Sequence, residues 1–395
     1  MFRNDGETEG ESMIARYLAC AIKQARERAR ILKGKIPNPA PIAELTGLQR
    51  TCEQRLDAII AALDQLIDDP LFGSESAARQ RIRLFRRAHE ELAHIEATGI
   101  AALNRHNADD VFMNRLVFQI HKEIGYPLAP PAVTCLSQQY FLIYPALGLL
   151  AVPLAESDFL LNLPDLYHEL AHPLLSTRDN PKLDGLQMEF ARLQEIISLH
   201  FQQEKATNIR STGPKEYFSY VLDALERAWL KFWAAELFCD LFATYTLGPA
   251  YACTHFHLTA TGRGDPFMVR LERLMPHPPD QARMDVMLLG LGLLNWQAEA
   301  SGIAQRWNHL VNTLSVKRHN LYERACPGVL LEAAAVCAFE GAKKLGCTLA
   351  SEDSACSGEI RRLLNTAWRE FWTSPEQYPA WERTRVAELR QLMVG

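Results

Sequence analysis

The sequence has no closely spaced cysteines. Its nine cysteines are scattered over 395 residues, and none belongs to a CxxC or CxxxC pair. A small secreted domain held together by disulfides would show an even, regularly spaced set. We therefore expect reduced thiols, no disulfide framework and a cytoplasmic protein.

The sequence also lacks an excess of positive charge and a long uninterrupted apolar run. Lys and Arg number 42 against 47 Asp and Glu, and the net charge of −5 argues against general nucleic-acid binding. The most apolar stretch, at 140–155, is short for a membrane span and is interrupted by Pro145, Gly148 and Pro153. Residues 1–12 are polar and acidic, so we expect no secretory signal and no membrane span.

The stretch LPDLYHELAHPLL at 163–175 contains the pattern HExxH, formed by His168, Glu169 and His172. Residues four apart lie on one face of an α-helix, so both imidazoles can reach a single metal ion. Two neutral histidines suit Zn²⁺, and a neighbouring carboxylate can take a proton from water on the metal. A chance match is the alternative in a chain of this length, so a second element is needed.

That second element is an ExxxD pattern, formed by Glu236 and Asp240. The two acids share a helical face, so Glu236 can be a third zinc ligand. Asp240 can accept the free ring N–H of a ligand histidine and so select its tautomer. An ordinary acidic pair on a solvated helix is the alternative, which the neighbours Trp233, Leu237 and Phe238 disfavour.

Most of the chain has the three-four spacing of apolar residues that is typical of amphipathic helices. Predicted helices of the first part lie at 11–34, 42–68, 75–103 and 108–124, and short apolar runs at 139–144 and 149–153 predict a β-hairpin. We expect a mainly α protein with a small β-sheet (α+β). Its predicted parts are an N-terminal helical region at 1–125, a core at 126–297 and a C-terminal helical region at 298–395.

Local signals also bound the helix that carries HExxH. Asn162 is expected to be its N-cap, and Pro164 suits the first turn. Pro173 lacks an N–H and disfavours helix at the residue before it. We therefore expect the helix to end or kink just after His172.

HExxH, ExxxD and an HPxxxxR pattern at 277–283 follow one another in this chain. This order resembles that of the gluzincin metallopeptidases and is similar to the CAAX prenyl protease and its bacterial heat-shock relatives, over about 140–294. The resemblance implies a zincin-like metallopeptidase core flanked by helical bundles. It also implies that His168, His172 and Glu236 are zinc ligands and that Glu169 is the general base. The supporting residues near the active site would be Asp240, His277 and Arg283.

The residue types and the resemblance together imply a zinc-dependent metallopeptidase that hydrolyses a protein or peptide substrate. An extended substrate would add to the edge strand expected before the HExxH helix, with the residues Leu149, Leu150, Ala151 and Val152. The helical flanks would restrict access or recruit a regulatory protein partner. Two alternatives remain: a catalytically silent zincin fold that regulates or binds, and a metal-free helical scaffold.

A donor opposite the metal would stabilise the negative charge that develops on the substrate carbonyl oxygen. We assign this catalytic role to His277, because Pro278 and Pro279 stiffen the turn that presents it. Arg283 would orient His277 or bind a substrate carbonyl. The alternative for His277 is a polar partner at a helix start, and four other side chains compete for the donor role: Tyr245, Tyr251, His255 and His257.

Overall fold

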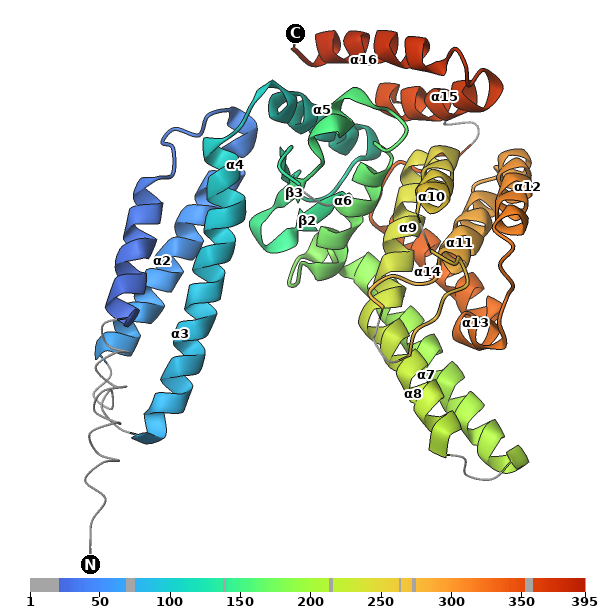
Figure 1. Ribbon diagram of the computed structural model, residues 1–395, viewed down its shortest axis with the longest axis horizontal. Coiled ribbons are helices and arrows are strands. Elements are labelled where there is room, and N and C mark those ends of the chain that lie inside the picture. The colour runs from blue at the N-terminus through green and yellow to red at the C-terminus, as the bar shows by residue number, and fades with distance from the viewer. Residues whose placement is uncertain are drawn as a thin grey trace, which may run out of the picture. The chain divides into compact units, whose positions relative to one another are not determined.

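The computed structural model describes the chain at 21–68, 75–137, 140–212, 216–262, 264–271, 275–351 and 358–394. Within these ranges the protein is mainly helical with a small amount of β-structure, as the sequence predicts (Figure 1). Among the helices described, none combines the length and the apolar character needed to span a membrane. The chain divides into two compact units, which comprise Met1–Asn114, Pro131–Gln138 and Ala146–Val152, and Arg115–Pro130, Gln139–Pro145 and Pro153–Gly395.

The first unit is built from long helices that bury apolar residues at three-four spacing. Buried positions in α2 recur as predicted for the helix at 42–68, at Leu48, Cys52, Leu56, Ile59 and Leu63. The predicted helix at 11–34 is helical over 21–34, and its first ten residues lie outside the described residues. The bounds are η1 (Ala43–Leu45), α2 (Thr46–Asp68), α3 (Glu75–Ile95), η2 (Glu96–Ile100) and α4 (Ala101–Asn104).

Two short parallel strands complete the first unit. Strand β1 (Ala132–Thr134) pairs with β3 (Leu149–Ala151), with Ala132 opposite Leu149 and Thr134 opposite Ala151. Helix α5 (Ala108–Ile124), which coincides with the predicted helix at 108–124, supports β1 through one side chain. The Asn114 amide donates to the carbonyl oxygen of Val133 at 2.6 Å and accepts from its N–H at 2.8 Å.

This pairing places the expected substrate strand in a core instead of at a free edge. All four residues are buried, namely Leu149, Leu150, Ala151 and Val152. The Val152 N–H donates to the carbonyl oxygen of Thr134 at 2.9 Å, so strand β1 uses the backbone groups on that side. Strand β1 has no signal in the sequence, because three residues give too short a pattern to distinguish a strand from a loop.

The second unit surrounds α9 (Ala234–Leu247), whose residues are buried almost without exception from Leu237 onward. Helix α9 packs against α6, α11 and α14, and α14 also runs along α7. The helices after residue 297 therefore belong to this unit and do not form a separate region. Its elements are β2 (Leu142–Tyr144), η4 (Leu154–Asp158), α6 (Asp165–Ser176), η5 (Pro181–Leu183), α7 (Asp184–Thr212), α8 (Glu216–Ala228), η6 (Trp229–Trp233), α9, α10 (Pro249–Thr261), α11 (Asp280–Leu293), α12 (Gln297–Thr313), α13 (Asn320–Ala325), α14 (Gly328–Lys344), α15 (Glu359–Thr373) and α16 (Tyr378–Val394).

Helix α6 differs from its prediction at both ends. Its N-cap is Pro164, and the side chain of Asn162 instead donates to Glu156 at 3.3 Å. The helix continues through Pro173 to Ser176, and the Thr177 N–H closes the last turn on the Pro173 carbonyl at 2.9 Å. Tertiary packing on α9 outweighs the single hydrogen bond that proline removes.

Candidate metal centre

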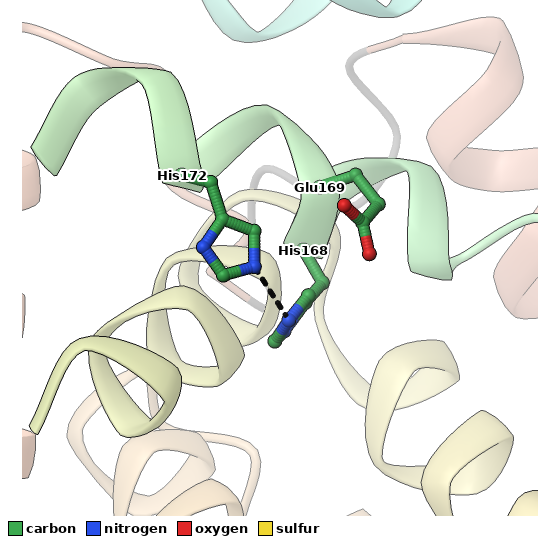
Figure 2. A group of neighbouring side chains, drawn as sticks. All are labelled: His168, Glu169 and His172. Atoms are coloured by element: carbon green, nitrogen blue, oxygen red, sulfur yellow. Dashed lines mark hydrogen bonds between the residues drawn. The ribbon is translucent and has the colours of Figure 1, made fainter. Parts of the chain in front are cut away.

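Helices α6 and α9 bring three potential metal ligands together. The Nε2 atoms of His168 and His172 lie 3.3 Å apart, and Figure 2 shows the two rings pointing toward one another. Glu236 reaches both rings, with Oε2 at 3.6 Å from His168 Nε2 and Oε1 at 3.9 Å from His172 Nε2. Ligand atoms about 2.0–2.2 Å from a tetrahedral zinc ion lie about 3.3–3.6 Å from one another. The donor set could therefore hold zinc.

A second carboxylate, that of Glu169, lies close to the same two rings. One oxygen of Glu169 lies within 4.8 Å of a nitrogen of His168 and of His172. Glu169 Oε2 accepts a hydrogen bond from the Ile143 N–H of β2 at 3.0 Å, which fixes the orientation of the carboxylate. Burial raises the pKa of Glu169 to about 7, although the positive charge of His168 opposes the shift.

Three side chains behind His168 form one buried network with it. His168 Nδ1 lies 2.9 Å from Asp240 Oδ1 and 2.9 Å from the hydroxyl oxygen of Tyr251. The Tyr251 hydroxyl donates to Asp240 Oδ1, and Arg283 donates to both carboxylate oxygens of Asp240, at 2.6 and 2.8 Å. The Asp240 carboxylate therefore has three partners within the protein, namely His168, Tyr251 and Arg283.

The charges of this network shift the pKa values of the two imidazoles in opposite directions. Burial opposes ionisation of Asp240, but the charge and hydrogen bonds of Arg283 hold its pKa well below the ordinary range. Burial lowers the pKa of His168, yet the hydrogen bonds to Asp240 and Glu236 outweigh it and raise this pKa to about 10. Burial and the charge of His168 lower the pKa of His172 to about 4. In the absence of a metal, one ring is thus cationic and the other neutral at pH 7.

A cavity of about 860 Å³ opens beside these residues. Its lining includes His168, Glu169, His172, Glu236 and Arg283, together with the segment 140–143 before and within β2. The four residues of the expected substrate strand are not among those that line it. The part of the chain beside the candidate metal site is thus β2, which belongs to the same unit as α6.

His277 contacts the candidate metal site through the potential ligand Glu236. Its Nδ1 lies 2.9 Å from Glu236 Oε2, and its side chain is 59% exposed. Arg283 does not orient His277, because its described hydrogen bonds go to Asp240 and Tyr251. His277 therefore contacts a potential metal ligand, and the donor role predicted for it stays a prediction.

The four other candidates for the donor role are less exposed than His277. The Tyr245 hydroxyl donates to the Ala335 carbonyl at 2.7 Å, and Tyr251 is bonded within the network. His255 Nε2 lies 3.0 Å from the Asp280 carbonyl oxygen, and His257 does not line the cavity. His277 alone among these five candidates is exposed.

Two contacts of the site had no signal in the sequence. Tyr251 lies 83 residues from His168, and no local spacing relates it to Asp240. Cys239 Sγ lies 3.5 Å from His172 Nδ1, so a thiol occupies the place where a carboxylate or carbonyl oxygen usually supports a ligand histidine. A search for polar residues on the buried face of α9 would have found Cys239 beside Asp240.

Comparison of the chain with protein-family models, curated proteins and solved structures finds no match. The side chains and their geometry are therefore what indicates a function. These define a group of two histidines and two carboxylates, of which His168 and Glu169 are buried, that line a large cavity in a mainly helical protein.

Proposed function

We propose that this protein is a zinc-dependent peptidase. The observation that carries the proposal is the convergence of His168, His172 and Glu236 at separations of 3.3–3.9 Å, close to the edges of a zinc tetrahedron. The order of the three motifs, which resembles that of the gluzincin peptidases, supports the same interpretation. No other cluster of metal-binding side chains occurs in the part of the chain that the structure describes.

The residues around this centre divide the work of hydrolysis. His168, His172 and Glu236 would hold zinc, which would supply an acidified water and polarise a carbonyl group. Glu169, whose carboxylate is held by the Ile143 N–H, would accept the proton of that water and deliver it to the leaving amine. Asp240 would keep the His168 ring in the tautomer that presents Nε2, because it accepts at Nδ1.

The cavity is large enough for a peptide segment. Its volume of about 860 Å³ lies toward the upper end of the roughly 300–1,000 Å³ that is typical of ligand pockets. Its wall includes the apolar residues Phe141, Leu142 and Ile143 beside the polar centre. Such a wall suits the side chains of an extended peptide.

The test compares the wild-type protein with Glu169→Gln, a nearly isosteric change that removes the base. Both are loaded with zinc and incubated with a defined mixture of synthetic peptides, and new peptide ends are measured by mass spectrometry. We expect the variant to keep its zinc and to cleave at least about 100-fold more slowly. Removal of zinc by a chelator should abolish cleavage, and added zinc should restore it.

Two outcomes would contradict the proposal. Cleavage by Glu169→Gln within tenfold of the wild type would exclude Glu169 as the base. A wild-type protein that holds one zinc but cleaves no peptide of the mixture would favour a catalytically silent fold.

A further inference from the structure

A wide helical turn, η6 (Trp229–Trp233), lies directly before α9 and its ligand Glu236. This segment is a π-helix, a rare form that occurs mostly as single turns inside α-helices and frequently at functional sites. Two buried tryptophans fix its ends. The Trp229 indole N–H donates to the Ala325 carbonyl at 2.7 Å, and that of Trp233 donates to the Met275 carbonyl at 3.0 Å.

Residues between these anchors face the cavity. Leu230 and Lys231 both line it, whereas the next residue, Phe232, does not. Phe232 lies under the Lys231 ammonium, whose Nζ is 5.1 Å from the ring centroid. The wide turn therefore presents one apolar and one cationic side chain to the space beside the metal centre.

Neighbouring elements add further residues to the lining of the same cavity. Leu175 comes from the end of α6, and Phe190 and Gln194 come from α7, which packs on η6. The Phe190 ring is braced edge-on against Phe238 of α9, with centroids 5.1 Å apart. Side chains with an apolar body and a negative end would match this part of the cavity, because a cation stands beside apolar surface.

Lys231 is free to bind a negative ligand. No carboxylate in the described ranges forms an ion pair with it. Apart from the histidines, the other basic side chain of the cavity lining is Arg283, which is already bonded to both oxygens of Asp240. Lys231 could therefore donate a charge-assisted hydrogen bond to a substrate carboxylate.

We propose that Lys231 is a specificity-determining residue that binds a carboxylate of the peptide substrate beside an apolar residue. The carboxylate is either an acidic side chain or a free C-terminus, which share the same chemistry. This inference rests on the proposed peptidase function and names the substrate class of that site. Leu230, Leu175 and Phe190 supply the contact for the apolar neighbour.

The test measures binding separately from hydrolysis. Zinc-loaded full-length protein with Glu169→Gln is titrated with hexapeptides that carry an uncharged fluorophore and contain Leu followed by Glu or by Gln. Each peptide is made with a free and with an amidated C-terminus, and Kd is obtained from fluorescence anisotropy. The Glu amide and the Gln acid distinguish a side-chain carboxylate from a terminal one.

Expected results follow from the loss of one charge-assisted hydrogen bond. A peptide with the recognised carboxylate should bind about tenfold more tightly than the neutral Gln amide, and Lys231→Met should remove this difference. Lys231→Glu should reverse it. The matched control is Lys122→Glu, because Lys122 also lies over a neighbouring ring, 4.3 Å from the Phe118 centroid, but does not line the cavity.

Zinc content and the thermal midpoint of each variant show whether it is folded. Equal binding of all four peptides, no measurable binding of any, or a carboxylate preference that survives Lys231→Met would overturn the proposal. Hydrolysis by the wild type without this preference would leave the peptidase function standing alone. Carboxylate-dependent binding by a wild type that hydrolyses none of the peptides would support the role of Lys231 and contradict the peptidase function.

Discussion

Arg283 donates from Nε and Nη2 to the two carboxylate oxygens of Asp240, at 2.8 and 2.6 Å. Asp240 is completely buried, and only 15% of the Arg283 side chain is exposed. A bidentate pair of this kind keeps the carboxylate ionised inside the protein. The ionised Asp240 can therefore accept the Nδ1 proton of His168, which lies 2.9 Å from its Oδ1.

The first prediction concerns this pair. Arg283→Met should lower the free energy of unfolding by about 3–5 kcal/mol, because it leaves the buried Asp240 charge without its partner. Urea denaturation measures the change. The double variant Arg283→Met with Asp240→Asn should recover part of the loss, since it removes both charges. A single variant as stable as the wild type would show that Asp240 is protonated or solvated.

The second prediction separates the two glutamates. Glu236→Gln should lower zinc affinity at least about tenfold, because a neutral amide replaces a ligand carboxylate. Glu169→Gln should change zinc affinity by less than threefold, since Glu169 is bonded to the Ile143 N–H and acts on a proton. Competition with a chromophoric chelator measures both. The opposite order would make Glu169 a ligand, which its position within 4.8 Å of both rings permits.

A third prediction addresses Asp240 and Tyr251 separately. Asp240→Ala should weaken zinc binding by about 10–100-fold, as expected for the partner of a ligand histidine. Tyr251→Phe should have a smaller effect of about fivefold, because it removes one neutral donor to Asp240 and leaves the ring packed. Chelator competition is again the measurement. If Tyr251→Phe has the larger effect, the hydroxyl and not the carboxylate orients His168.

The fourth prediction concerns His277. Because its Nδ1 lies 2.9 Å from Glu236 Oε2, His277→Ala should weaken zinc binding by about 10-fold through a less ordered Glu236. The unfolding free energy should change little, since the His277 side chain is 59% exposed. Zinc affinity and kcat are measured on the same preparation. Unchanged zinc affinity with a lower kcat would instead support the predicted donor role toward the substrate oxygen.

Local elements could be read from the sequence alone. The spacing of His168 and His172 places both on one face of α6, and the apolar pattern at 108–124 coincides with α5. The mainly helical fold follows from the same three-four spacing. Such features depend on contacts within one or two turns, and those contacts are visible in consecutive residues.

Capping and strand pairing were less visible. Asn162 has the right chemistry for an N-cap, but its side chain bonds Glu156 and the helix starts after Pro164. The run at 149–152 was predicted to be an edge strand, because its parallel partner β1 is only three residues long and gives no signal in the sequence. Burial of that run depends on a parallel partner strand. The apolar pattern of one strand does not identify that partner.

Tertiary structure alone decided which distant residues meet. Glu236 approaches His168 and His172 because α9 packs on α6, and Arg283 turns to Asp240 because α11 packs on α9. Tyr251 joins the same group from α10, and the wide turn before α9 brings Lys231 into the cavity. Sequence determines the faces that a helix offers, through its periodicity. Which faces come together is set by the burial of apolar surface over the whole chain, and no single segment contains that information.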